Sequence, residues 1–169
     1  ISSGVTDVGA YENQSDLPLL TAASSATVDL GFVAVNTNAN VTIDLSNTGK
    51  LDFDILDVSV PNGAFFIDTP VQGTVKPGEA AKVTVRFRPT REKVYTDTLT
   101  VRSTSSNAPV MKIALRGVGI SGTLVRGGTI AANWTKAGSP YTVTGDLRVT
   151  KNQSLTIQPG VVVRFAGHF

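Results

Sequence analysis

Apolar and polar residues alternate along most of this chain, and clusters of glycine, proline and asparagine separate the alternating runs. No window places apolar residues at i, i+3, i+4 and i+7 over several turns, as an amphipathic helix requires. Alternation with a period of two is typical of strands that bury one face. The pattern therefore predicts an all-β protein.

Short strands are expected at regular intervals between residues 28 and 119. Turn sequences such as Asn47-Thr-Gly49 and Val75-Lys-Pro-Gly78 end or separate them. Seven or eight strands at a spacing of roughly 8–12 residues indicate an immunoglobulin-like antiparallel β-sandwich. Gly117-Val-Gly119 is expected to release the chain from it. The expected strands are Val28–Val33, Val41–Leu45, Phe53–Ile55 with a continuation to Val60, Ala64–Ile67, Lys82–Arg88, Tyr95–Arg102 and Met111–Arg116.

The pattern changes after Ile120, where glycine becomes more frequent and the alternating runs shorten. Tight turns such as Gln158-Pro-Gly160 favour strands that coil into a rung over strands that pair as a meander. We therefore expect three parts: an irregular N-terminal linker (1–27), the sandwich (28–119) and a short C-terminal β-solenoid-like segment (120–169). The strands expected in the last part are Tyr141–Thr144, Leu147–Thr150, Ser154–Ile157 and Val161–Phe165.

Composition limits the functions and the cellular location that are expected for this fold. The 169 residues are 41% hydrophobic and 17% charged, and the net charge is +2. A charge so close to neutral argues against nucleic-acid binding, which needs a concentrated basic face. The longest apolar run, Val161–Val163, is too short to cross a membrane. Cysteine is absent, which excludes disulfides and thiolate metal sites. Together with abundant serine, threonine and asparagine, this favours a secreted or cell-surface protein of a bacterium.

Seven motifs occur in a recognisable order between Val28 and Gly119. They are Asp29-Leu-Gly-Phe-Val33, Leu45-Ser-Asn-Thr-Gly49, Phe65-Phe-Ile67, Val75-Lys-Pro-Gly78, Val83-Thr-Val-Arg-Phe-Arg-Pro89, Leu99-Thr-Val-Arg-Ser103 and Leu115-Arg-Gly-Val-Gly119. In this order they resemble the immunoglobulin-like family named for the abnormal-spindle protein and hydin, which is related to the major sperm protein sandwich. The resemblance implies a sandwich that binds or spaces partners and has no enzyme activity.

A second set of motifs lies between Ser121 and Phe165. It comprises Asn133-Trp-Thr135, Gly138-Ser-Pro-Tyr141, Val143-Thr-Gly-Asp146 and Leu155-Thr-Ile-Gln-Pro-Gly-Val-Val-Val-Arg-Phe165. This stretch resembles the start of right-handed parallel β-helix domains in large bacterial surface proteins. Asp7-Val-Gly-Ala-Tyr-Glu12 is similar to the exit of another such helix. The resemblance implies a joint between two β-solenoids, and we expect both ends to continue in a longer protein.

The sequence offers no catalytic constellation, and we expect no cofactor. His168 is the only histidine, so a serine–histidine–aspartate triad has no base elsewhere in the chain. Asp52 and Asp54, with Asp57 nearby, share a strand face and are candidates for a calcium site or an acid–base pair. The alternative is a solvated outer face, with Phe53 and neighbouring apolar residues pointing inward.

Basic and aromatic residues supply the other candidates. Arg86 and Arg88, extended by Arg91 and Lys93, form a basic stripe that could bind an acidic polymer. No exposed aromatic ladder accompanies the stripe, so nucleic acid is not expected. The alternative is an outer sandwich face whose charges protect the sheet edge.

Trp134 and Tyr141 are candidates for stacking on sugar rings. The favoured alternative is that Trp134 caps the first turn of the solenoid by covering apolar ends that would otherwise face water.

The leading hypothesis is a non-catalytic structural, spacer or adhesive module of a large exported bacterial surface protein. Its partners would be other domains of that protein, with surface polysaccharide or protein as further candidates. The alternatives are an accessory fragment of a β-helical polysaccharide lyase or hydrolase, and a carbohydrate-binding module. Because a single rung cannot bury its own face, we also expect a homodimer or strand exchange through the exposed edge.

Overall fold

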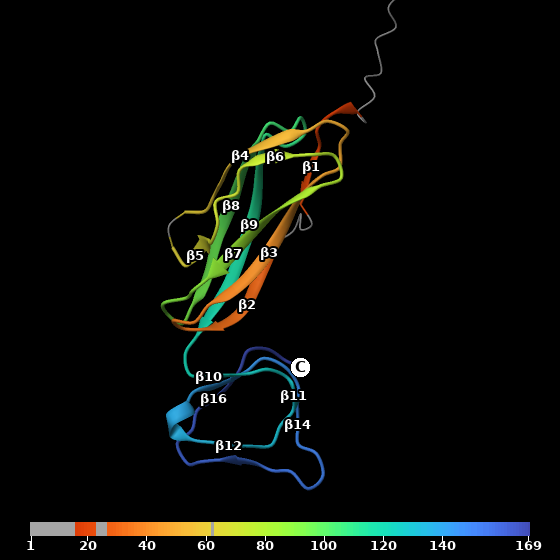
Figure 1. The fold of residues 1–169 in the computed structure, drawn as a ribbon. Coiled ribbons are helices and arrows are strands. Elements are labelled where there is room, and N and C mark those ends of the chain that lie inside the picture. The colour runs from red at the N-terminus through yellow and green to blue at the C-terminus, as the bar shows by residue number, and fades with distance from the viewer. Residues whose placement is uncertain (1–15, 23–26, 62) are drawn as a thin grey trace, which may run out of the picture.

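Two β-regions are joined by a single passage of the chain in the computed structural model, which describes residues 16–22, 27–61 and 63–169 (Figure 1). The larger is a sandwich that runs from Leu20 to Ile120. The smaller, called here the C-terminal β-region, covers residues 123–165 and lies beyond the end of the sandwich at which the chain leaves it (Figure 1). No helix in the described part of the chain is long and apolar enough to span a membrane.

The sandwich consists of a four-stranded and a five-stranded sheet that face each other across one core. The four-stranded sheet has the order β1-β3-β7-β5 and the five-stranded sheet the order β2-β9-β8-β4-β6. These strands are β1 (Leu20–Ala22), β2 (Val28–Ala34), β3 (Ala39–Asn47), β4 (Phe53–Ser59), β5 (Phe65–Ile67), β6 (Gly73–Val75), β7 (Ala80–Phe87), β8 (Val94–Ser103) and β9 (Val110–Ile120).

The pairing of these strands corrects the expected sandwich in three respects. It is not wholly antiparallel, because β2 pairs with β9 in parallel. Leu20–Ala22 was assigned to the linker but forms β1, which pairs with β3. The motif Gly117-Val-Gly119 does not release the chain, because β9 continues through it to Ile120. Residues 7–12, the expected exit of a preceding β-helix, lie outside the described residues.

The core of the sandwich follows the predicted alternation, with Phe87 at its centre. Val83, Val85 and Phe87 of β7 are each 0% exposed. The Phe87 ring stacks on Phe65, with 4.7 Å between ring centroids. It also lies against Gly117 of β9, where an added Cβ would be 2.5 Å from a Phe87 ring carbon. The ring therefore fills the space that the absent side chain leaves free.

Asn47 connects the turn after β3 to the opposite sheet. It is 2% exposed, and its Nδ2 donates to the carbonyl oxygens of Leu51 and Val75, both at 2.8 Å. Its Oδ1 accepts a hydrogen bond from Gly49 N at 2.9 Å. A Cβ on Gly49 would lie 2.0 Å from Leu17 O. The motif Asn47-Thr-Gly49 therefore has two roles. The Asn47 side chain satisfies main-chain groups, and Gly49 lets the turn lie close to Leu17.

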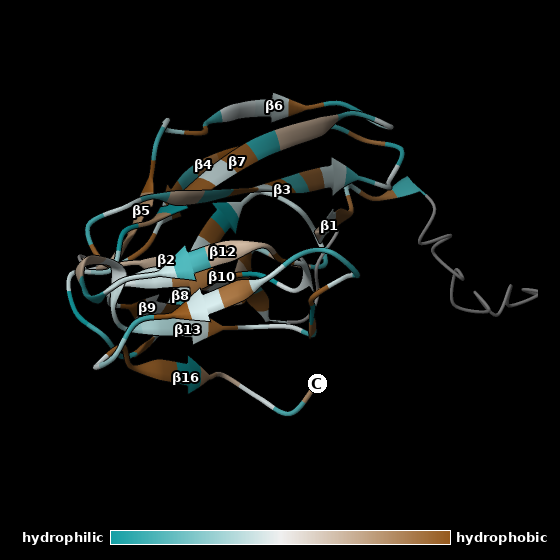
Figure 2. Ribbon diagram, turned by 90° about the horizontal axis from the view of Figure 1, so that it is seen from below, coloured by the Kyte–Doolittle hydropathy of each residue, from teal (hydrophilic) through white to brown (hydrophobic). Residues whose placement is uncertain are grey.

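The C-terminal β-region contains short strands that pair in parallel. A meander would pair neighbouring strands antiparallel, whereas here β10 pairs with β13, β13 with β16, β11 with β14, and β12 with β15. Figure 2 shows β10, β13 and β16 stacked in that order. The elements are β10 (Thr123–Val125), β11 (Gly128–Thr129), β12 (Ala132–Trp134), the 3-10 helix η2 (Lys136–Gly138), β13 (Tyr141–Val143), β14 (Leu147–Arg148), β15 (Leu155–Ile157) and β16 (Val163–Phe165).

Replacement of Gly117 by alanine should destabilise the sandwich, because the new methyl group would overlap the buried Phe87 ring. Overpacking of this kind costs about 1–3 kcal/mol. Gly63→Ala is the matched control, since a Cβ there would find its nearest atom at 3.8 Å. Urea unfolding of the three proteins measures the difference. Equal stability of the two variants would contradict the close approach of β9 and Phe87.

Replacement of Asn47 by alanine should lower the free energy of unfolding by about 2–3 kcal/mol, because it leaves main-chain groups without their partner. Asn40→Ala is the control, because Asn40 lies on the same strand and is exposed. Chemical denaturation followed by circular dichroism gives both values. A loss no greater for Asn47 than for Asn40 would show that the three hydrogen bonds contribute nothing.

Candidate functional site

The loop between β7 and β8 brings Glu92 to the junction between the sandwich and the C-terminal β-region. Glu92 accepts a hydrogen bond from the Ser121 hydroxyl, just after β9, and forms an ion pair with Arg164 of β16. Arg164 and Glu92 have side-chain exposures of 47% and 45%. A pair this exposed adds little stability, and what it shows is that β16 lies in contact with the β7–β8 loop of the sandwich.

The loop that carries Glu92 is itself held in place. Gly119 N donates to Lys93 O at 2.9 Å, so the loop is bound to β9 directly before the chain leaves the sandwich. The Tyr95 hydroxyl accepts hydrogen bonds from the main-chain N–H groups of Thr90 and Arg91 at 3.2 and 2.9 Å. Burial raises the pKa of Tyr95, but the hydrogen bond with the Thr90 side chain, the main-chain hydrogen bonds of Arg91 and Thr90 and the charge of Lys93 outweigh it and leave the pKa below its ordinary value.

Sequence reasoning missed Glu92. It is one acidic residue in a turn rich in basic residues, and its partner Arg164 lies 72 positions further along the chain. No spacing rule connects two residues that distant. Only the folded chain brings them together.

The basic stripe is partly neutralised within the protein. Arg86 forms an ion pair with Asp68 at 2.9 Å, and its guanidinium lies 5.6 Å from the centroid of the Phe66 ring. Lys93 Nζ lies 4.6 Å from the centroid of the Tyr95 ring. Arg88 is exposed on the outer face of the sandwich. The stripe therefore presents fewer free cations than its sequence indicates.

Asp52 and Asp54 lie on the solvent side of β4 and the turn before it. Both are exposed, whereas Phe53 and Ile55 are 1% and 2% exposed. Asp54 Oδ1 accepts a hydrogen bond from the Thr74 hydroxyl at 2.6 Å. Among residues 16–22, 27–61 and 63–169, no three His, Cys, Asp or Glu side chains gather in a way that could hold a metal ion.

Trp134 and Tyr141 form the core of the C-terminal β-region. They are 4% and 6% exposed, and their rings stack with centroids 4.5 Å apart at an interplanar angle of 10°. The Tyr141 hydroxyl accepts a hydrogen bond from Thr135 N at 3.0 Å. One face of each ring packs against the other ring, and the rest of each ring lies in the interior of the region. Neither is placed to stack on a sugar.

An open cavity of about 750 Å³ lies between the residues that connect β13 to β14 and those that follow β16. His168 belongs to its lining, and Asp146 is the one carboxylate there. Asp146 and His168 are the titratable side chains of the lining, which contains no serine, threonine, cysteine or lysine. The lining consists of Gly145, Asp146, Leu147, Phe165, Ala166, Gly167, His168 and Phe169.

The two facing sheets, their common core and the parallel β2–β9 pair define an immunoglobulin-like sandwich module. The model of the HYDIN/CFA65/VesB-like Ig-like domain matches residues 22–118, and the chain belongs to this family. The match begins within β1 and ends within β9, as the sandwich does. No curated protein matches the chain.

Solved structures with this fold come from distant proteins. The ASH/PapD-like domain 7 of human CEP192 is 14% identical and aligns with a TM-score of 0.54, covering 72% of this chain and 99% of that domain. A protein of unknown function from Porphyromonas gingivalis W83 is 15% identical, also with a TM-score of 0.54. The alignment covers 62% of this chain and 48% of that protein, so the chain spans about half of its length. At these identities the likeness concerns the fold alone.

The single tryptophan makes the packing of the C-terminal β-region measurable. We expect Trp134 to emit at short wavelength and to resist quenching by iodide, because its ring is buried against Tyr141. Tyr141→Ala should shift the emission to the red and increase quenching. Phe66→Ala, which changes a partly exposed aromatic ring of the sandwich, should leave both unchanged. A wild-type spectrum typical of exposed tryptophan would contradict the stacked pair.

Proposed function

We propose that this chain is a non-catalytic structural, spacer or adhesive module of a large exported bacterial surface protein. In this proposal the sandwich leads directly into the first coils of a parallel β-helix. The observation that carries it is the passage from β9 to β10, which leaves only Ser121 and Gly122 between the two regions. A spacer needs such a short joint, because a long flexible connection would not hold one region at a set angle to the other.

The order of strand pairing supports the assignment of the C-terminal β-region to a β-helix. Strands β10, β11 and β12 pair in turn with β13, β14 and β15, and β16 begins a further layer on β13. Thr123 aligns with Tyr141, and Tyr141 with Val163. This is a period of roughly 20 residues, which falls in the range of repeat architectures built from stacked units.

The interior of these layers also supports it. Val143 is 0% exposed and packs with the Trp134–Tyr141 pair. Each layer buries apolar residues against the next, as solenoid units do because none can bury its own face alone. Trp134, expected to cap the first turn, lies within this interior at the end of β12.

Composition is what supports export. Cysteine is absent, and serine, threonine and asparagine occupy many exposed positions. In this proposal the sandwich is the partner-binding unit, and its partners are other domains of the parent protein. Surface polysaccharide is a second class of partner, but the burial of Trp134 and Tyr141 removes the aromatic rings that would most readily bind it.

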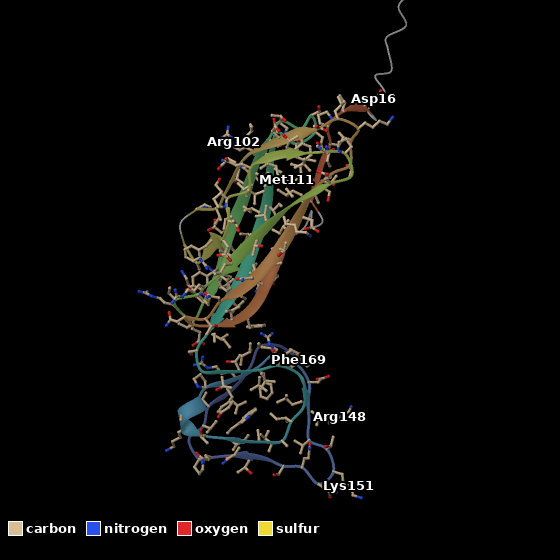
Figure 3. The ribbon with its side chains drawn as sticks, in the orientation of Figure 1. Asp16, Arg102, Met111, Arg148, Lys151 and Phe169 are labelled. Carbon is tan, nitrogen blue, oxygen red and sulfur yellow. The ribbon has the colours of Figure 1, made fainter. Side chains whose placement is uncertain are left out.

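A rigid joint is the measurable property of a spacer. Spin labels on cysteines introduced at Arg102, on the sandwich, and Lys151, in the C-terminal β-region, should report one narrow distance distribution by double electron–electron resonance (Figure 3). The chain has no cysteine of its own to interfere. Glu92→Ala should broaden the distribution, because it removes the contacts to Ser121 and Arg164.

Lys82→Ala is the matched control for this measurement. It removes an exposed ion pair of similar kind, Lys82 with Asp44 at 3.0 Å, that lies wholly within the sandwich. The control should keep the narrow distribution. A broad distribution in the unmodified protein would mean that the two regions move independently, and the spacer function would then be wrong.

A further inference from the structure

The outer face of the four-stranded sheet carries an exposed aromatic ring among polar side chains. Alternate residues of β3, β5 and β7 point into the core, so the residues between them face solvent. Phe66 is accordingly 39% exposed, whereas Phe65 beside it is 2% exposed. The side chains that meet around this ring are called here the Phe66 patch, which consists of Asn40, Thr42, Phe66, Asp68, Thr84 and Arg86.

The strand register arranges the patch in adjoining rows. Figure 1 shows β5, β7 and β3 next to one another. Phe66, Arg86 and Asn40 are paired across these strands, and two inter-strand spacings span about 10 Å. The neighbouring row contains the hydroxyls of Thr84 and Thr42, whose oxygens are 3.3 Å apart. The patch is therefore a polar strip on a sheet surface, with the aromatic ring on the edge strand.

The polar groups of the patch have hydrogen-bonding capacity that the protein does not use. Arg86 Nη1 lies 2.9 Å from Asp68 Oδ1, and the two side chains are 40% and 27% exposed. A guanidinium has five N–H donors and a carboxylate has about four acceptor sites, so this contact leaves most of them available. Asn40 is exposed, and its amide forms no side-chain hydrogen bond among the described residues. Donors and acceptors are thus both open to solvent.

The charges on these strands balance. Arg86 is paired with Asp68, and Lys82 of β7 is paired with Asp44 of β3 at 3.0 Å. Arg88, which follows β7, is the neighbouring cation outside these pairs. Because each cation of the strands has a carboxylate beside it, the patch does not require a charged partner. Charge complementarity therefore favours an uncharged partner that both donates and accepts hydrogen bonds.

We propose that the Phe66 patch binds a neutral polysaccharide. A sugar ring offers both kinds of surface that the patch needs. Its C–H groups pack against the electron-rich face of an aromatic ring, and its hydroxyls donate to a carboxylate and accept from a guanidinium or an amide. One ring packs on Phe66, and the chain continues over Arg86 toward Asn40. The inference rests on the adhesive part of the proposed function, for which it names the surface and the class of partner.

A protein partner fits this surface less well. Protein interfaces are organised around a central cluster of apolar and aromatic residues that become fully covered. Phe66 has polar neighbours on the sheet, namely Arg86 and the groups around it. The other exposed large apolar residues of the sandwich, as far as it is described, lie outside β3, β5 and β7; they are Leu51, Leu56, Val94 and Val110.

Isothermal titration calorimetry on the whole chain tests the proposal with hydroxyethylcellulose, galactomannan and arabinoxylan. At least one of these neutral polysaccharides should bind, and equally well at about 0.1 M and about 1 M salt, because screening acts on charges. Phe66→Ala should raise the dissociation constant about tenfold or more. Arg86→Lys should raise it about threefold although the charge is kept, since lysine lacks the planar fork of donors. Leu56→Ala, which changes an exposed apolar residue of the other sheet, should bind as the unmodified protein does.

Asn40→Ala is the second variant, because it removes an exposed side chain on which folding does not depend. It should weaken binding with an unchanged free energy of unfolding. No binding of any of the three polysaccharides, or unchanged affinity in both Phe66→Ala and Asn40→Ala, would overturn the proposal. Binding of polygalacturonate alone, lost at high salt, would overturn it in favour of the basic stripe. A narrow spin-label distance distribution without polysaccharide binding would remove the Phe66 patch and leave the spacer function standing.

Discussion

The absence of side chains at Gly117 and Gly119 is the constraint on which both regions depend. At Gly117, β9 lies against the Phe87 ring, and at Gly119 an added Cβ would lie 2.2 Å from Arg91 O. The core of the sandwich and the β7–β8 loop are therefore placed by the same stretch of strand. Any side chain there would push the loop away from β9 just where the chain leaves the sandwich.

The position of that loop determines how the second region is held. The loop carries Glu92, which reaches Ser121 at the exit of β9 and Arg164 in β16. Neither contact is strong, because the ion pair is about half exposed and screened by solvent. Their value is geometric, since they act on a joint that is already short. Such a joint suits the spacer function proposed above, because a spacer must hold one region at a set angle to the other.

The candidate residues differ in how well their neighbours in the sequence predict their environment. The alternation around Phe53 and around Phe87 correctly indicated which side chains turn inward, and hence that Asp54 and Arg86 lie outside. The same reasoning left the role of Trp134 open, because an aromatic residue in a glycine-rich stretch suits both a sugar platform and a core. Its burial against another ring favours the core, and that contact depends on the layers above and below.

The sequence by itself determined the all-β class, most sandwich strands and the family, because alternation and turn chemistry act over a few neighbouring residues. The turn motif at Asn47 could be recognised in the sequence, although the hydrogen bonds of the Asn47 side chain could not. Only the tertiary structure decided the parallel β2–β9 pair, the pairing of β1 with β3 and the pairing of Glu92 with Arg164. Each of these joins segments far apart in the chain, and so leaves no local pattern in the amino-acid order.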